Sequence, residues 1–151
     1  RIQYFMKKYI AVVCFLLLTI SCKQTPKETE ETDFPISVGC YGYTQDGSTI
    51  TFQVTRVDPM VQGTLIYNWA EKDRNSGSFS GSIDDNIILG TYTFISEGVE
   101  STRQVAFKIS GDQLIEGFGE VTSSGKMVAF KNASALNFDG SVTLTKDQCA
   151  N

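Results

Sequence analysis

Residues 48–57 read STITFQVTRV, and this stretch indicates the fold class. Its apolar residues Ile50, Phe52 and Val54 alternate with threonine and glutamine, which is a period of two. Such a period places one face of a β-strand on a core and the other face in solvent. Threonine, valine, isoleucine and phenylalanine also favour the pleated surface of a sheet. The stretch therefore predicts a half-buried strand.

Similar runs follow along the rest of the chain. Turn signals such as Asp46-Gly47 separate them, because Gly tolerates positive φ and Asp bonds its own backbone. No helical period and no crossover long enough for a parallel sheet follow the N-terminal residues. We predict about nine strands. They lie near residues 36–44, 48–57, 63–70, 78–83, 87–96, 102–109, 113–121, 126–131 and 141–145.

Consecutive strands of this kind form an antiparallel sheet, whose edges must be protected. Closure into a barrel removes the edges completely, whereas a two-layer sandwich covers them in part. The long consecutive hairpins favour an all-β fold over residues 36–151, an antiparallel up-and-down barrel of about 8–9 strands. A two-layer β-sandwich is the alternative.

Composition excludes several classes of function. The 151 residues include no histidine and carry a formal net charge of −4. The length fits one domain, and the acidic charge argues against binding nucleic acid through a basic surface. Without histidine there is no Ser-His-Asp triad, no Cys-His dyad and no His-ligated metal site. We expect no cofactor and no nucleic-acid partner.

The N-terminal residues predict a targeting segment. Two lysines after the first methionine precede YIAVVCFLLLTI, residues 9–20, which carry no charge. A helix needs about 20 apolar residues to span a bilayer, so this run is too short. A basic start, a short apolar run and a small residue before a cut site predict a signal peptide over residues 6–21. We expect residues 1–5 to lie upstream of the coding sequence.

Residues 18–22, LTISC, resemble the lipobox of bacterial lipoproteins, in which a small residue precedes the cysteine that becomes the lipidated N-terminus. Ser21 and Cys22 fit this pattern, and Thr19 stands where leucine is usual. The resemblance implies a diacylglyceryl thioether on Cys22, commonly with an added N-acyl chain such as palmitate. Two or three acyl chains exceed the marginal binding of a single chain, which implies stable attachment to a membrane.

A charged segment follows the cysteine. Residues 23–34 read KQTPKETEETDF and contain almost nothing apolar, so we predict that residues 22–35 form a lipidated flexible tether. Lys23 directly follows the lipidated cysteine. By resemblance to lipoprotein sorting in enteric bacteria, this lysine implies the outer membrane rather than the inner one. Whether the domain faces the periplasm or the cell surface stays open.

The cysteines predict one disulfide bond. Processing would remove Cys14 and acylate Cys22, which leaves Cys40 and Cys149 near the two ends of the folded region. An even pair in a secreted domain predicts a bridge, and two buried free thiols are the alternative. No C-x-x-C spacing is present, so we expect a structural role rather than a redox role.

Two arginines fall on the apolar phase of their strands. Arg56 continues the phase of Val54, and Arg103 precedes Val105. An inward arginine at a strand end could bind a carboxylate at the barrel mouth. The alternatives are a side chain that extends to solvent and a structural ion pair.

Glu116 is the candidate partner for one of these arginines. Its phase holds Leu114 and Phe118, and the opposite phase is also apolar, so either could face inward. A buried carboxylate needs a partner. We predict that Arg103 is substantially buried and pairs with Glu116, with Glu97 as its second choice. A pair of this kind could also fix strand register alone.

Three aromatic residues complete the candidate ligand-binding set, which is Arg103, Glu116, Arg56, Tyr67, Trp69 and Tyr92. The aromatic residues are most simply core, and they form pocket walls if the interior is under-filled. No catalytic residue and no metal site is predicted. Asp84-Asp85-Asn86 lacks the spacing of a calcium loop.

These observations predict a cell-envelope lipoprotein whose barrel binds a small ligand or a protein partner. An inhibitor or accessory subunit of an envelope enzyme is the alternative. The mature domain resembles small β-barrel envelope lipoproteins, lipocalin-type barrels among them, by architecture only. Without histidine or a free thiol after processing, we expect no enzymatic activity. A cavity inside the barrel would favour ligand binding, and a filled interior would favour a surface interaction.

Overall fold

The computed structural model describes residues 34–149, and in this range ten β-strands and one short 3-10 helix form. The strands are β1 (Gly39–Gln45), β2 (Ser48–Arg56), β3 (Val61–Asn68), β4 (Asn75–Asp84), β5 (Ile87–Ser96), β6 (Val99–Ser110), β7 (Gln113–Gly117), β8 (Val121–Ser124), β9 (Met127–Phe130) and β10 (Thr143–Asp147). The helix is η1 (Ala133–Ala135).

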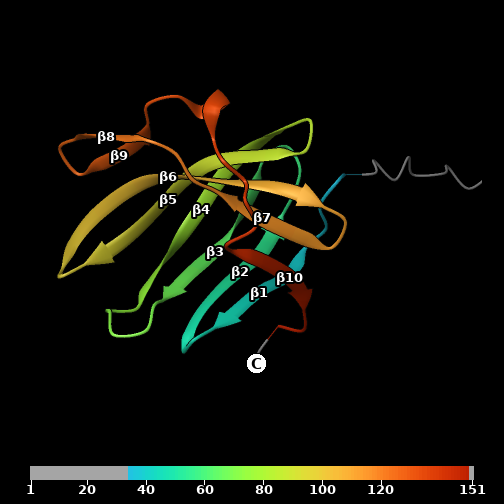
Figure 1. Cartoon of the computed structure of the whole chain (residues 1–151), viewed down its shortest axis with the longest axis horizontal. Helices are drawn as coiled ribbons and strands as arrows, with labels where there is room; N and C mark the ends of the chain where they lie inside the picture. Colours follow the sequence, from blue (N-terminus) through green and yellow to red (C-terminus); the bar gives the residue numbers. More distant parts are fainter. Residues whose placement is uncertain (1–33, 150–151) are drawn as a thin grey trace, which may run out of the picture. The chain divides into compact units, whose positions relative to one another are not determined.

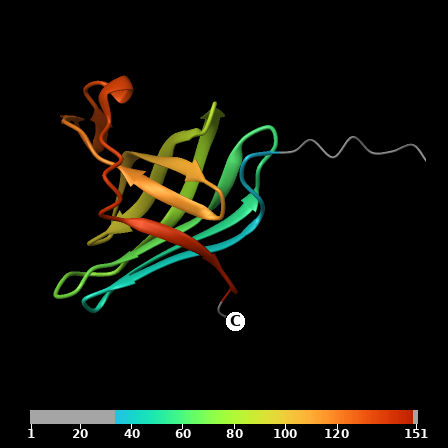
Figure 2. The same cartoon turned by 45° about the vertical axis from the view of Figure 1, so that its right-hand side comes forward.

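Eight of these strands close into an antiparallel barrel (Figure 1). Strands β1 to β7 pair in chain order, and β10 lies between β7 and β1 to complete the circle. The view in Figure 2 shows this wall from its side, with β10 beside β1. The predicted all-β, up-and-down barrel is confirmed, and the sandwich alternative is wrong. Closure leaves these eight strands without an open edge.

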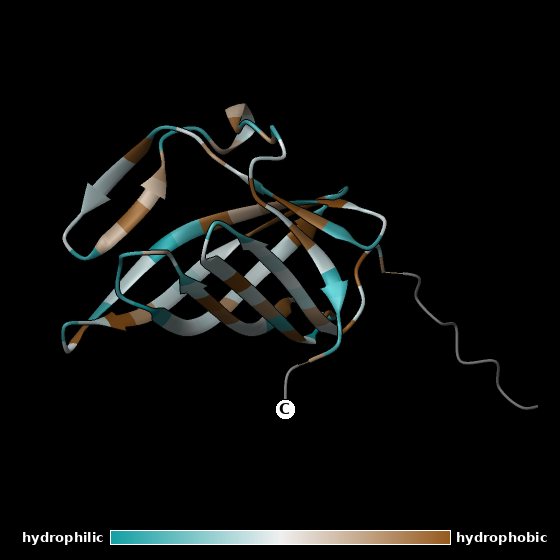
Figure 3. Ribbon diagram, turned by 60° about the horizontal axis from the view of Figure 1, so that its bottom comes forward, coloured by the Kyte–Doolittle hydropathy of each residue, from teal (hydrophilic) through white to brown (hydrophobic). Residues whose placement is uncertain are grey.

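The predicted strand over residues 113–121 ends early, at Gly117. There the chain leaves the barrel, forms the hairpin of β8 and β9, and returns through η1 to β10. A Cβ on Gly117 would lie 2.4 Å from the ring of Phe138, because the returning segment packs directly on this position. Strand β9 runs parallel to β6 beside Thr102 and Arg103. Figure 3 shows the hairpin projecting from the barrel wall.

Aromatic rings fill the middle of the barrel. Phe52, Phe79 and Phe107 are each at most 2% exposed. The ring centroid of Phe52 lies 5.0 Å from that of Phe79 and 5.5 Å from that of Phe107. Contacts at these distances are typical of packed aromatic clusters. The interior is thus a side-chain core at its centre, and any open site must lie toward one end or outside.

Glycines allow the strands to approach one another at the inward positions of β3 to β5. A Cβ on Gly63 would lie 2.1 Å from the carbonyl oxygen of Gln53, and one on Gly77 would lie 2.0 Å from that of Thr93. Real Cβ atoms do not approach a carbonyl so closely, so neither position accepts a side chain without a shift of the backbone. These glycines permit the tight coiling that barrel closure needs.

The predicted bridge between Cys40 and Cys149 is present. The two Cα atoms lie 5.1 Å apart, within the normal range for a disulfide. Cys40 belongs to β1, and Cys149 follows β10, which pairs with β1. The bridge therefore joins the first and last strands of the barrel at the seam where it closes.

Candidate functional site

Four inward-facing side chains form a polar cluster at one end of the barrel: Tyr67 on β3, Tyr92 on β5, Arg103 on β6 and Glu116 on β7. We call this end the mouth. The strand register explains how they meet, because Tyr92 is directly opposite Arg103 and Phe107 is opposite Glu116. Each side chain lies on the same phase as the apolar core of its strand.

Tyr67 is the centre of the cluster. Its hydroxyl donates a hydrogen bond of 2.8 Å to Oε1 of Glu116. Its ring lies 4.4 Å from the guanidinium carbon of Arg103 and 5.5 Å from the ring centroid of Tyr92. The first of these contacts is a cation–π interaction, which stabilises the arginine without neutralising its charge.

Three buried atoms of the cluster have no hydrogen-bond partner in the described part of the chain. They are Oε2 of Glu116, Nε of Arg103 and the hydroxyl of Tyr92. A buried polar atom without a partner costs about 1–3 kcal/mol, so native structures contain few of them. All three atoms belong to residues that contact Tyr67, so unsatisfied buried polar atoms gather at this end of the barrel.

The predicted ion pair between Arg103 and Glu116 is wrong. Among residues 34–149, the only ion pair with nitrogen and oxygen within 4.0 Å joins Lys131 to Glu120. Instead, the hydroxyl of Tyr67, on β3, donates the hydrogen bond to Glu116 that Arg103 was expected to donate. Arg103 faces inward as the alternation predicts, but its side chain is only half-buried. Glu97, the second predicted partner, is exposed in the β5–β6 turn.

Burial controls the protonation of the cluster. Glu116 is 5% exposed, and loss of solvent raises the pKa of its carboxyl group, although the Tyr67 hydrogen bond and the nearby Arg103 charge oppose the rise. Burial also raises the pKa of Tyr67 well above its ordinary value and that of Tyr92 to about 12. The two phenols therefore keep their protons at neutral pH, and burial shifts Glu116 toward its protonated form.

Two aromatic rings form the rim of the mouth. Trp69 follows β3 and stacks on Tyr67 with ring centroids 6.1 Å apart, and Phe94 stacks on Tyr92 at 4.8 Å. Both rim residues are half-buried. Sequence reasoning named Trp69 as a candidate site residue, and it treated Phe94 as a core residue that could form a pocket wall without adding it to the ligand-binding set. The shared phase of Phe94 and Tyr92 on one strand was the signal that could have found it.

Arg56 does not join the cluster. The pairing of β2 with β3 shifts register between Val54 and Arg56, and this irregularity takes Arg56 off the inward phase. Its side chain is exposed at the end of β2 that leads to β3, whereas the mouth lies where β3 leads to β4. The sequence-based expectation of an inward arginine at this position is wrong, because a bulge breaks strict alternation.

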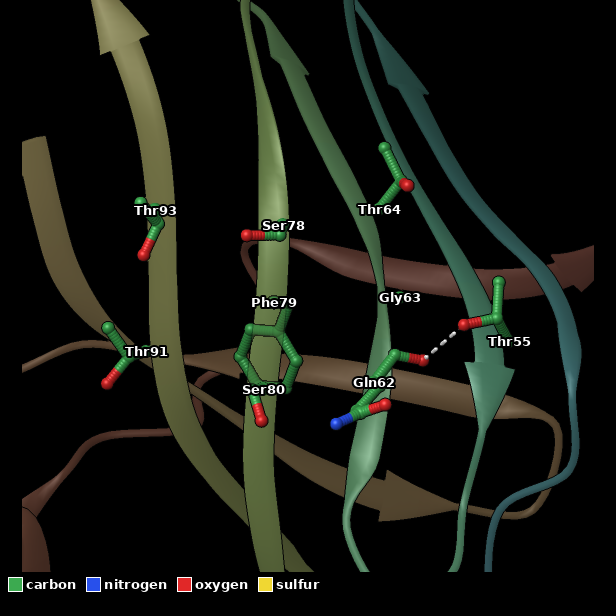
Figure 4. A pocket seen from close by; sticks show the side chains of 9 residues that line it. All are labelled: Thr55, Gln62, Gly63, Thr64, Ser78, Phe79, Ser80, Thr91 and Thr93. Carbon is green, nitrogen blue, oxygen red and sulfur yellow. Dashed lines mark hydrogen bonds between the residues drawn. The ribbon is translucent and has the colours of Figure 1, made fainter. Parts of the chain in front are cut away.

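Two hollows lie outside the barrel wall. A groove of about 410 Å³ crosses β2 to β5 and is lined mainly by hydroxyl groups (Figure 4). A cleft of about 460 Å³ separates the β4–β5 hairpin from the segment that follows η1. The cleft combines Asp84 and Asp85 with the apolar Leu89, Leu136 and Phe138. Neither hollow holds a buried polar atom without a partner.

No helix among residues 34–149 is long and apolar enough to cross a membrane. No group of three or more aspartate, glutamate or cysteine residues there is placed to hold a metal ion. The candidate anchor Cys22, the signal peptide of residues 6–21 and most of the tether of residues 22–35 lie outside the described residues.

Comparison with protein-family models, with curated proteins and with solved structures finds no match to this chain. The class of the molecule is therefore defined by its own geometry, which is a closed eight-stranded antiparallel barrel with a partly unsatisfied polar cluster at one mouth.

Proposed function

We propose that this protein is a lipid-anchored protein of the bacterial cell envelope whose barrel mouth binds a small ligand. The lipobox-like sequence that ends at Cys22 and the polar segment after it support the anchor. The disulfide between Cys40 and Cys149 fits an oxidising compartment. Lys23 after the anchor cysteine supports the outer membrane. The proposed role is binding, with no catalytic step.

One observation carries the ligand-binding part of this proposal. Three buried polar atoms on Arg103, Glu116 and Tyr92 lack partners at the mouth, and aromatic rings line its rim. Small-molecule sites combine apolar walls with a few polar groups that fix the orientation of the ligand. The centre of the barrel is filled, which by itself favours a surface interaction, so we propose that a ligand binds at the mouth, where the unpartnered atoms lie, rather than in a deep cavity.

Intrinsic fluorescence tests this proposal directly, because Trp69 is the sole tryptophan of the chain and lies at the rim. The full-length protein is titrated with a panel of anionic, neutral and cationic small molecules that carry an apolar group. We expect saturable changes in Trp69 emission with at least one member, and loss of these changes in an Arg103→Met, Glu116→Gln double variant that still folds. A panel without any saturable response would contradict ligand binding at the mouth.

A second candidate function rests on a different observation. Seven large apolar side chains are exposed in the described part of the chain, and five of them belong to the β5–β6 tip, the residue after β7 and the β8–β9 hairpin. They are Ile95, Val99, Phe118, Val121 and Met127. Concentrations of exposed apolar residues are typical of protein-interaction surfaces. This distribution supports an inhibitor or accessory subunit that docks on an envelope enzyme through its projecting hairpin.

Crosslinking in intact cells tests this alternative. A photoreactive residue at Met127 should capture one defined envelope enzyme, and the purified protein should change the activity of that enzyme. A Val121→Ser, Met127→Ser variant should lose both effects. Capture that persists in this variant, or an enzyme whose activity does not change, would count against the alternative.

A further inference from the structure

The unpartnered atoms of the mouth share one chemical property. Nε of Arg103 is a hydrogen-bond donor, and the Tyr92 hydroxyl keeps its proton and can donate. Oε2 of Glu116 becomes a donor when the carboxyl group is protonated, and its buried position favours that form. Two of the three unpartnered atoms are thus donors, and the third is a donor whenever Glu116 is protonated, so an acceptor is the partner that satisfies all three.

The positive charge of Arg103 also indicates that the missing partner is an acceptor. Arg103 makes no ion pair with any described residue, and its guanidinium lies over the rings of Tyr67 and Tyr92. Oε1 of Glu116 is already occupied by Tyr67, so a protonated Glu116 leaves the arginine charge without an anion. A planar guanidinium beside further donors matches the geometry of a carboxylate.

Among the described residues, Arg103 and Glu116 are the charged groups that the strands turn toward this site. Tyr67 donates a hydrogen bond to Glu116, and Arg103 acts on Glu116 through its charge. The inward residues of β2 toward the mouth are Ser48 and Ile50, and on β1 the mouth-side residue is Tyr43, whose hydroxyl donates a hydrogen bond to Gln45. The β3–β4 loop at this end also carries charges, but its residues 71–74 are all exposed.

The rim indicates the rest of the molecule that fits. Trp69 stacks on Tyr67 and Phe94 stacks on Tyr92, and the guanidinium of Arg103 lies over the rings of Tyr67 and Tyr92. A ligand whose carboxylate reaches Arg103 would lie against this group of rings. Flat apolar groups gain most from such walls.

We propose that the mouth binds a planar, apolar monocarboxylate, with its carboxylate held by Arg103 and Tyr92 and hydrogen-bonded to a protonated Glu116. This inference rests on the proposed function and specifies its ligand class. At a pH where Glu116 is ionised in the free protein, binding of the anion is coupled to proton uptake by Glu116, because two adjacent carboxylates repel each other unless one is protonated. Affinity therefore falls as the pH rises.

Phenylacetate and phenylacetamide provide a matched pair of probes. They differ in the charge of the head group and share the same ring. Titrated into the full-length protein and followed by Trp69 fluorescence, phenylacetate should bind at least about tenfold more tightly than phenylacetamide. Acetate, which lacks the ring, should bind more weakly than phenylacetate. An amide that binds as tightly as the acid would overturn the inference.

Single-residue variants test which side chains hold phenylacetate. Arg103→Gln should weaken phenylacetate binding about tenfold or more, whereas Arg56→Gln, the exposed arginine at the other end of β2, should leave it unchanged. Tyr92→Phe keeps the ring and removes the hydroxyl, so it should weaken phenylacetate binding by about threefold to tenfold. This variant also replaces Arg103→Gln as the test if the arginine variant fails to fold. Equal affinity in Tyr92→Phe and the parent protein would overturn the assigned contact.

Proton uptake provides a separate measurement. Calorimetric titration in two buffers of different ionisation enthalpy should show proton uptake with the parent protein and none with Glu116→Gln, whose amide still donates to the anion. Absence of uptake by the parent at every pH would overturn the role of Glu116. If another member of the fluorescence panel binds at the mouth and phenylacetate does not, the ligand class is wrong and the proposed function stands. If no panel member binds, both the proposed ligand class and the proposed function are wrong.

Discussion

Glu116 combines a buried structural contact with the binding role that we propose for it. It is the only buried charged side chain in the described core, and one of its two oxygens is satisfied by Tyr67. Evolution of a purely structural core would favour an apolar side chain here, because buried ionisable groups gain little stability against hydrophobic replacements. The unsatisfied oxygen and the nearby unpaired arginine are easier to understand as parts of a binding site.

The raised pKa of Glu116 predicts how stability depends on pH. The native state holds this proton more tightly than the unfolded chain, so stability is greatest below the unfolded pKa of about 4.3 and falls as the pH rises toward the native value. Glu116→Gln removes this titration. In urea unfolding, the variant should gain relative to the parent by up to about 1.4 kcal/mol per pH unit across that window.

A control variant tests whether the pH dependence of stability comes from the buried carboxyl group of Glu116. Glu100→Gln changes an exposed carboxyl group on β6 and should follow the parent at each pH. A Glu116→Gln variant whose advantage is constant between acidic and neutral pH would show that Glu116 titrates normally in the native protein.

Arg103 and Glu116 should also be energetically coupled. Arg103→Met removes the positive charge beside Glu116 and should cost about 1–3 kcal/mol in neutral or alkaline buffer, where an ionised Glu116 has most need of it. Adding Glu116→Gln should recover most of this loss, because no buried charge then remains. A double-mutant cycle measures the coupling, and additive single effects would contradict it.

At the scale of the strands, glycine sets how tightly the wall can coil. Gly77→Ala should destabilise the protein by about 1–3 kcal/mol or more, because its Cβ would meet the carbonyl of Thr93 at 2.0 Å. Gly42→Ala is the matched control in the same barrel, since no atom lies within 4 Å of a Cβ at that position. Thermal unfolding of both variants checks the contrast, and equal losses would show that steric contact is not the cause.

The strands themselves were largely predictable from sequence. Alternation placed Ile50, Phe52 and Val54 on the core side of β2 and did the same for Val105 and Phe107 on β6, and the structure buries all five. Period two is a local property, and burial of one face fixes it. The barrel followed because eight such strands connected in order have few other ways to protect their edges.

The differences between the sequence-based predictions and the structure come from contacts between residues that are far apart in the sequence. The apolar phase of residues 113–121 continues past Gly117, but β7 ends at that glycine, where Phe138 from the returning segment packs on it. Likewise, Arg103 was correctly placed on an inward phase and either phase was left open for Glu116, but a residue of β3, Tyr67, makes the hydrogen bond to Glu116. The spacing of residues along one strand does not predict which side chain of a distant strand will contact them across the barrel. It also does not predict a bulge such as the one before Arg56.

At the scale of the whole molecule, the disulfide fastens the seam of the barrel. It links residues 109 positions apart, and loss of a bridge that closes a loop of this size costs about 2–5 kcal/mol. Cys149→Ser should therefore lower the midpoint of urea unfolding without changing the antiparallel sheet seen by circular dichroism. Reducing agent should lower the midpoint of the parent protein to that of the variant and leave the variant itself unchanged.

Attachment to a membrane is the last prediction, and it concerns Cys22, which lies outside the described residues. If Cys22 carries the acyl chains, then Cys22→Ala should appear in the soluble fraction of the envelope or remain unprocessed, because the variant has no thiol to which the acyl chains could be attached. Labelling with radioactive palmitate should mark the parent and not the variant. Cys14→Ala is the matched control, since that cysteine belongs to the segment expected to be removed, and it should keep both the label and the membrane fraction. A Cys22→Ala protein that is cleaved normally and still sediments with outer membranes would show that the domain is held there by another contact, and the exposed apolar residues of the β8–β9 hairpin would then be the first place to look for it.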